Sequence, residues 1–171
     1  MEKRFESAEA QEILKDFKRF SIEELNKIFG SGTLFLFEEI RGKTAGSFLA
    51  WKAQNPAFVK FGTKLLFESP FGCWIGKEFI KPFSREEKGF GVNLFNNFFL
   101  PKRFWFKTYF KNSFFDGNPC LALDYRPYKS LMFGLVDDVR KIKDGIFLGQ
   151  MYFKFPFKKN FQFLGYFLLA L

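Results

Sequence analysis

The stretch from Lys102 to Lys111 alternates between two kinds of side chain, and this alternation constrains the fold more than any other feature. Phe104, Phe106, Thr108 and Phe110 fall on one side of an extended chain. The other side carries a basic and aromatic set, namely Arg103, Trp105, Lys107, Tyr109 and Lys111. A period of two is that of a β-strand with one face against a core. We therefore predict a half-buried strand here.

Similar short segments follow one another along the chain, separated by turn signals. Residues 116–119 (Asp-Gly-Asn-Pro) and 143–145 (Lys-Asp-Gly) are strong turns. This spacing is typical of an antiparallel sheet, and we expect the sheet to close into a lipocalin-like barrel of about eight strands. The other predicted strands span residues 73–80, 89–95, 120–125, 146–153 and 161–169.

The first 30 residues have helical periodicity instead. Ile13, Leu14, Phe17 and Phe20 form a helical stripe, and Ser21-Ile-Glu-Glu24 is a capping box that starts a second helix, which we expect to stop near Gly30. The predicted fold class is therefore mainly β (α+β), with N-terminal helices over residues 1–30 and a barrel body over 31–171. We expect one domain.

Five segments give weaker signals. Residues 33–40 form a β-type run, and residues 42–46 resemble a turn. Residues 47–55 resemble a short helix that Pro56 ends. The stretch 58–68 is ambiguous with a strand favoured, and 130–139 is expected to contain a short helix or a long excursion.

Histidine is absent from the chain, whereas phenylalanine supplies 30 of its 171 residues. Without histidine, the Ser–His and Cys–His nucleophile pairs and imidazole metal ligands are excluded. We expect no metal and no other cofactor. The phenylalanine excess has two interpretations: mutational bias of an AT-rich genome, or an apolar cavity lined with aromatic rings.

The net charge of +9 is unevenly distributed. Residues 1–24 carry seven acidic and five basic side chains, and the remainder carries 11 and 22. A basic body favours anionic partners such as nucleic acid, acidic lipid or a carboxylate ligand, although charge also keeps an aromatic-rich chain dispersed.

The chain has two cysteines, and we see no apolar leader and no apolar run of ~20 residues. We therefore expect a cytoplasmic protein without a transmembrane segment. Peripheral contact with a membrane stays open, as does the oligomeric state.

The segment Trp74-Ile-Gly-Lys77 with Phe79 is one candidate for chemistry. On a regular strand Trp74 would share a face with Gly76 and Glu78, and Lys77 would lie on the other face with Phe79. Gly76 suits a bulge or a close approach of backbone or ligand. The segment is either a core strand with a bulge or a pocket wall where Lys77 meets a carboxylate or phosphate.

Two further clusters carry acidic groups. Asp124, Tyr125 and Arg126 end a strand, where they form either a salt bridge with packing or a polar pocket mouth. In Val136-Asp137-Asp138-Val139-Arg140 the adjacent acids diverge. We expect one of them to be solvated and the other to pair with Arg140.

These segments give the chain a resemblance to a known family. Four segments resemble those of bacterial lipocalin-like, calycin-type domains, nearest to uncharacterised GXWXG-containing proteins. They are Trp74-Ile-Gly-Lys-Glu-Phe79, Ala122-Leu-Asp-Tyr-Arg-Pro127, residues 136–142 and Asp144-Gly-Ile-Phe-Leu-Gly-Gln-Met151. The N-terminal signature is not kept, because residues 38–42 preserve only its last glycine. The resemblance implies a β-barrel with a hydrophobic-ligand cavity and no established enzyme activity.

We favour a non-enzymatic binding protein for a small hydrophobic or anionic amphipathic ligand, fatty-acid-like. The candidate ligand-binding residues are Trp74, Lys77, Phe79, Phe106, Asp124, Tyr125, Arg126, Asp137 and Arg140. One alternative is an enzyme that uses Asp124, Tyr125 or Asp137 as acid and base. The other is nucleic-acid binding through the basic aromatic face of residues 103–111, which we weigh below a structural role.

Overall fold

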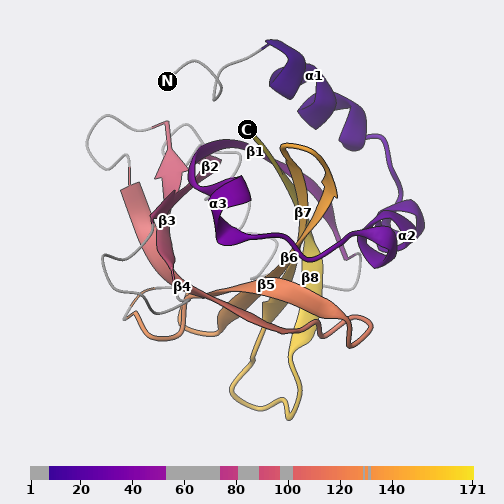
Figure 1. Cartoon of the computed structure of the whole chain (residues 1–171). Helices are drawn as coiled ribbons and strands as arrows, with labels where there is room; N and C mark the ends of the chain where they lie inside the picture. Colours follow the sequence, from indigo (N-terminus) through magenta and orange to yellow (C-terminus); the bar gives the residue numbers. More distant parts are fainter. Residues whose placement is uncertain (1–7, 53–73, 81–88, 97–101, 129, 131) are drawn as a thin grey trace.

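A closed antiparallel β-barrel forms the body of the protein. The computed structural model describes residues 8–52, 74–80, 89–96, 102–128, 130 and 132–171. Within these ranges eight strands pair in chain order, and the last pairs with the first (Figure 1). The predicted class, mainly β with N-terminal helices, is confirmed. The strands are β1 (Gly42–Trp51), β2 (Trp74–Ile80), β3 (Phe90–Phe95), β4 (Lys102–Asn112), β5 (Pro119–Asp124), β6 (Leu135–Lys143), β7 (Ile146–Phe153) and β8 (Gln162–Ala170).

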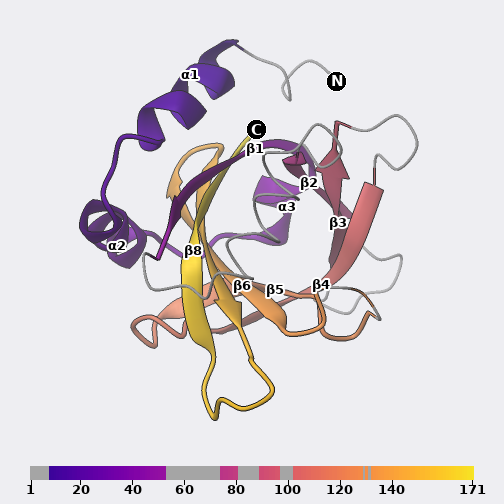
Figure 2. The same cartoon turned by 180° about the vertical axis from the view of Figure 1, so that it is seen from behind.

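Two helices lie along the outside of this barrel. They are α1 (Ala8–Phe17) and α2 (Ile22–Ser31), which contact β1, β8 and β6 (Figures 1 and 2). The predicted capping box is confirmed, since Ser21 and Glu24 satisfy each other's backbone N–H groups. Leu25 and Phe29 of α2 are fully buried against the barrel. No described helix has the length and apolar character to cross a bilayer.

A third helix, α3 (Phe37–Ile40), lies across one end of the barrel (Figure 1). The β-type run predicted over residues 33–40 is therefore wrong except at Thr33, which forms an isolated bridge with Lys141. The Glu39 carboxylate caps the start of this helix, because it accepts the backbone N–H of Leu36 at 2.8 Å. Ile40 belongs to the interior cluster, so this segment closes one end.

The turn predicted over residues 42–46 and the helix over 47–55 are also wrong where the chain is described, since β1 runs from Gly42 to Trp51. Long-range pairing overrides the local signal, because β1 bonds to both β2 and β8 and so closes the barrel. Position 46 has no room for a side chain, because a Cβ atom there would overlap the Trp74 ring. Residues 53–55 and the segment 58–68 lie outside the described residues.

The helix or excursion predicted over 130–139 corresponds to a turn that ends before Leu135, where β6 begins. The strand forms despite its two adjacent acids because residues 136–139, which include both acids, pair with β5 on one side and with β7 on the other.

Apolar side chains pack on both sides of the barrel wall. The inner cluster includes Phe147 and Phe167, whereas Leu148 and Tyr166 belong to an outer cluster beneath α1 and α2. This two-sided burial explains why β5, β7 and β8 are nearly continuous apolar runs in the sequence. The inner cluster holds the polar groups described next.

Candidate functional site

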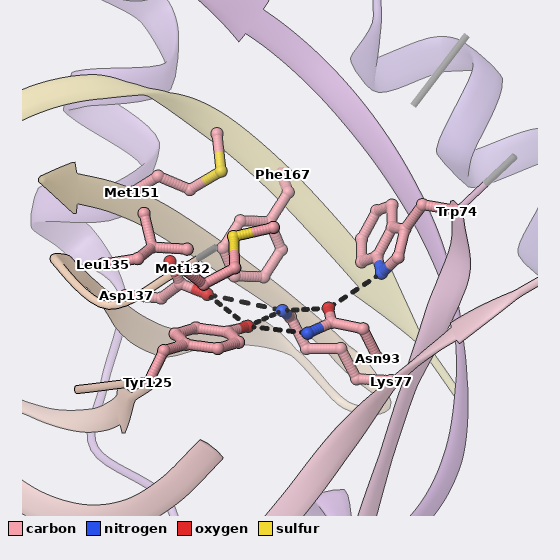
Figure 3. Close-up of a pocket in the computed structure, with 9 residues that line it drawn as sticks. All are labelled: Trp74, Lys77, Asn93, Tyr125, Met132, Leu135, Asp137, Met151 and Phe167. Carbon is pink, nitrogen blue, oxygen red and sulfur yellow. Dashed lines mark hydrogen bonds and ion pairs between the residues drawn. The ribbon is translucent and has the colours of Figure 1, made fainter. Parts of the chain in front are cut away.

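A cluster of polar side chains lies inside the barrel, and it draws on three strands and on the residue that follows a fourth (Figure 3). Lys77 comes from β2, Asn93 from β3 and Asp137 from β6, and Tyr125 directly follows β5. Trp74, at the start of β2, donates its indole N–H to Oδ1 of Asn93 at 3.0 Å. Antiparallel pairing in chain order thus brings together residues that are up to 63 positions apart in the sequence, from Trp74 to Asp137.

Lys77 is the centre of this cluster. Its Nζ donates to Asn93 Oδ1 at 2.8 Å and to the Tyr125 hydroxyl at 2.5 Å, and it lies 3.4 Å from Oδ2 of Asp137. All three ammonium protons therefore have acceptors. The side chains of Lys77 and Asp137 are only 4% and 1% exposed. Charges at this depth persist only when they are paired and hydrogen-bonded in this way.

Tyr125 and Asn93 complete the network. The Tyr125 hydroxyl donates to Oδ2 of Asp137 at 3.2 Å and accepts from Nδ2 of Asn93 at 3.2 Å. The same Asn93 amide donates to the backbone oxygen of Phe104 at 3.0 Å. Both side chains are therefore held in one orientation.

Two bulges shape this cluster, and the first turns Trp74 and Lys77 inward. Trp74 pairs with Phe95 and Gly76 with Leu94, so Ile75 is an extra residue in β2. Consequently Trp74 and Lys77 both face the interior, and the prediction that they lie on opposite faces is wrong. Gly76 makes the bulge possible, since its φ of 152° brings its Cα against the carbonyl of Thr44.

The second bulge lies in β4, where Phe104 is the extra residue. Val92 pairs with Trp105 and Asn93 with Arg103, and Phe104 takes a φ of 61°. This conformation is uncommon for a bulky side chain. It turns the Phe104 carbonyl toward Asn93, which fixes the amide that holds Tyr125 and Lys77.

Burial shifts the protonation equilibria of the cluster. Desolvation raises the pKa of Asp137 to about 6, although Lys77 acts in the opposite direction. Desolvation also lowers the pKa of the Lys77 ammonium, against the attraction of Asp137. The pKa of Tyr125 is raised well above its ordinary value, first by burial and then by the Asp137 charge. The tyrosine is therefore a neutral hydrogen-bonding group at ordinary pH.

One hydrogen-bonding position of the cluster stays open. Oδ1 of Asp137 is buried and has no hydrogen-bond partner among the described groups, and in Figure 3 only the other oxygen carries dashed lines. A cavity of about 20 Å³ adjoins this carboxylate. That volume is enough for one water molecule. Its lining is Trp74, Lys77, Asn93, Tyr125, Met132, Leu135, Asp137, Met151 and Phe167.

The structure brings four of the nine predicted site residues to this cavity: Trp74, Lys77, Tyr125 and Asp137. Phe106 and Phe79 are buried next to them, with the Phe106 ring 5.4 Å from that of Tyr125 and 5.5 Å from that of Phe79. The Lys77 ammonium also lies 5.3 Å from the centroid of Phe106. These two rings support the cluster and do not line the cavity.

Asp124 and Arg126 lie on the outer side of the barrel wall. The Arg126 guanidinium donates from Nε to Oδ1 of Asp124 at 2.8 Å and from Nη2 to Oδ2 at 2.7 Å, and the Tyr109 hydroxyl donates to Oδ2 at 3.1 Å. Burial opposes ionisation of Asp124, but the hydrogen bonds from Arg126 outweigh it and lower the pKa. Of the two alternatives for this strand end, a salt bridge or a pocket mouth, the contacts correspond to the salt bridge between Asp124 and Arg126.

Arg140 is buried under α2, away from the cavity. Its guanidinium donates to both oxygens of Asp116, at 2.8 and 2.6 Å, and to the backbone oxygen of Phe29 at 3.1 Å. Hydrogen bonds from Arg140 hold the pKa of Asp116 at about 2, against a smaller effect of burial. The predicted pairing of Arg140 with a neighbouring aspartate is wrong.

The expectation that Asp137 or Asp138 would be solvated is also wrong, because both are buried. Asp137 points inward to Lys77. Asp138 points outward, where it lies 2.7 Å from Lys111 and accepts the backbone N–H of Phe114 at 2.8 Å. The outer face of β6 is covered by other segments, which strand alternation alone does not reveal.

Five cavity residues were missed from the sequence: Asn93, Met132, Leu135, Met151 and Phe167. Asn93 did carry a signal, since it is the one polar side chain in the apolar run 91–95. A polar group in a buried strand needs partners, which marks it as part of a network. The apolar four carry no signal that separates cavity lining from filled core.

The basic aromatic face of β4 is partly used within the molecule. Lys111 pairs with Asp138, Tyr109 contacts Asp124, and the Arg103 guanidinium lies 4.4 Å from the Phe95 ring. Trp105 and Lys107 are exposed. Phe110, expected on the buried face, is 41% exposed.

Metal binding has no support in the part of the chain that the structure describes, where no group of three or more Cys, Asp or Glu side chains could hold an ion. Cys120 is buried, and desolvation raises the pKa of its thiol to about 12. That thiol is protonated at ordinary pH and therefore a poor nucleophile.

No family model matches the chain, and no curated protein matches it either. Among solved structures, a crystal structure of a protein from Thermomonospora curvata is similar, with a TM-score of 0.57 and 14% sequence identity. The match covers 95% of each chain. At this identity the similarity concerns the fold alone, an eight-stranded barrel that follows short helices.

Proposed function

We propose that the barrel binds a small amphipathic ligand whose polar end donates a hydrogen bond to Asp137. The observation that carries this proposal is the open Oδ1 of Asp137 beside the cavity. A buried charged acceptor without a partner costs about 1–3 kcal/mol or more, so a ligand that supplies a donor gains that energy on binding.

The chemistry of the cluster suggests the class of ligand. Every proton of Lys77 is already used, so the open position calls for a donor, such as a hydroxyl or a protonated carboxyl group. The remaining walls, Trp74, Met132, Leu135, Met151 and Phe167, suit an aliphatic chain. A fatty alcohol or a fatty acid has both parts, in agreement with the hydrophobic cavity that the resemblance to GXWXG-containing proteins implies.

The size of the cavity sets a condition on this proposal. About 20 Å³ accommodates the polar end alone, so an aliphatic chain requires Met132 and Met151 to move. Methionine is unbranched and flexible, and it is the apolar side chain that rearranges most readily. Short and medium chains are therefore the favoured ligands.

Native mass spectrometry of protein purified without detergent, followed by titration with decanol and decanoic acid, tests the proposal. We expect a bound amphiphile or saturable binding of one of the two compounds. Asp137→Asn should weaken binding about tenfold or more, since a hydrogen bond to a charged group is lost. Asp124→Asn, on the outer wall, is the matched control and should leave the affinity unchanged.

A resident water molecule is the competing explanation for the open oxygen. If nothing co-purifies and neither compound binds, including to a Met151→Ala variant with a wider cavity, the proposal is wrong.

A further inference from the structure

The connections at the two ends of β7 differ in charge. At the end where β7 leads into β8, residues 151–163 contain no acidic side chain, and Lys154, Lys158 and Lys159 are their only charged groups. Lys158 and Lys159 are exposed and have no acidic partner among the described residues. The opposite end carries both signs, with Glu39 paired to Lys141 and Asp144 beside the same lysine. The molecule therefore presents a purely basic hairpin at one end.

The same hairpin exposes an aromatic side chain. Phe157 is 99% exposed between these lysines, and the hairpin projects from the barrel in both views (Figures 1 and 2). Phe133, in the neighbouring connection between β5 and β6, is 57% exposed. Transfer of an apolar ring from water to an apolar phase is favourable, so the fully exposed Phe157 would gain free energy from burial in a partner.

A row of rings connects this surface with the interior. Phe133 lies 5.9 Å from Phe153, and Phe153 lies 4.8 Å from Phe155. Phe153 and Phe155 pack against the interior cluster, which includes Met151 of the cavity. The exposed aromatics thus belong to the end of the barrel that is continuous with the cavity lining.

We propose that the β7–β8 hairpin docks the protein on an anionic membrane surface, with Phe157 inserted at the acyl-chain boundary and Lys154, Lys158 and Lys159 facing acidic headgroups. An apolar side chain surrounded by lysines is the combination that interfacial binding uses, in which apolar burial and attraction to anionic lipid act together. The docked end would be the one that borders the cavity. Docking itself does not require the cavity to be occupied.

A lipid surface fits this hairpin better than nucleic acid. Single-stranded nucleic acid is held along a basic groove with several aromatic platforms in succession. Here one ring stands at the tip of a projecting turn, and the other rings of the hairpin are partly buried: Phe153 and Phe155 pack against the interior cluster, and Phe161 is stacked against Phe114 at 4.6 Å. The hairpin therefore makes a point contact, which suits insertion into a bilayer.

Co-sedimentation of the full chain with vesicles tests the proposal. We expect binding at low salt to vesicles of phosphatidylcholine with phosphatidylglycerol, little binding to phosphatidylcholine alone, and weaker binding at high salt. The double variant K158E/K159E should lower the partition coefficient about 25-fold or more, from roughly fivefold for each lysine. Phe157→Ser should lower it about tenfold.

Matched controls lie at the opposite end of the barrel. K43E/K143E reverses two exposed lysines there, and Leu36→Ser removes an exposed apolar side chain. Both should bind vesicles nearly as the unchanged chain does, and so should Asp137→Asn, which separates docking from ligand binding. Absence of binding to anionic vesicles, equal loss in K43E/K143E, or tight binding of single-stranded DNA that depends on Phe157 would each overturn the proposal.

Discussion

At the scale of single residues, the pair of Lys77 and Asp137 is the most consequential feature of the molecule. Each charge is buried, each is paired, and three neutral groups, from Trp74, Asn93 and Tyr125, fix their geometry. Such a pair contributes little net stability compared with apolar side chains of the same size, yet it is costly to break. Its value therefore lies in specificity or in binding.

The pH dependence of stability should report on Asp137. The unfolded chain releases this proton near pH 4 and the folded protein at about pH 6. Between these values the folded state binds more protons, so its stability falls as the pH rises, by roughly 3 kcal/mol for two pKa units. Asp116, with its pKa held at about 2, acts in the opposite sense.

Comparison with Asp137→Asn isolates the effect. Urea unfolding at several pH values should show the stability of the unchanged chain falling relative to Asp137→Asn from pH 4 to pH 7. A constant difference between the two proteins would contradict the raised pKa.

Breaking the pair from the other side should be severe. Lys77→Met leaves Asp137 as an unpaired buried charge at neutral pH, which should cost about 3–5 kcal/mol of unfolding free energy. The double variant K77M/D137L removes both charges and should recover a large part of that loss. A double-mutant cycle in urea checks this, and purely additive losses would show that the two side chains do not act as a pair.

At the scale of elements, the bulge in β2 determines which side chains reach the interior. Gly76→Ala places a methyl group against the carbonyl of Thr44, so we expect a loss of about 3 kcal/mol or more together with weaker pairing of β1 and β2. Gly30→Ala in α2 is the contrast, since the nearest atom of Phe115 would be 3.8 Å away. That change should stabilise by up to about 1 kcal/mol. Urea midpoints of both variants decide the matter.

Elements with strong local signals could be predicted from the sequence. Residues 102–111 show the period of two, and Ser21 with Glu24 shows the capping box. Each of these signals is contained within a short stretch of sequence and is therefore visible without the structure. β1 could not be predicted, since its glycines and small side chains serve contacts with β2 and β8, more than 20 residues away at the nearest. For the site, Trp74 and Lys77 were candidates, but their common direction depends on a bulge whose pairing partner is β3.

At the scale of the whole molecule, the helices and the barrel share one apolar cluster. Phe29 of α2 is fully buried, and its ring lies 6.4 Å from Tyr166 of β8 and 4.6 Å from the Arg140 guanidinium. We therefore expect helices and barrel to unfold together.

Phe29→Ala tests this cooperativity. It should cost about 3–5 kcal/mol in one transition, seen alike by circular dichroism and by the fluorescence of Trp51, Trp74 and Trp105, which all belong to barrel strands. Leu36→Ala, at an exposed position, is the control and should change little. Separate transitions for the two signals would show that the helices are an independent unit.

The adjacent aspartates of β6 affect how the pairing register of this strand is determined. If β6 slipped by one residue, every side chain would change faces, but Asp138 would replace Asp137 inside, and Lys77 would still find an acid. The ion pair that Lys77 forms inside the barrel therefore does not by itself distinguish the two registers. Arg140 does, because slippage would carry its guanidinium into the apolar interior and away from Asp116 and the Phe29 carbonyl. The contacts of Arg140 with helix α2 and Asp116, on the outer side of the barrel, therefore favour the register of β6 that places Asp137 inside.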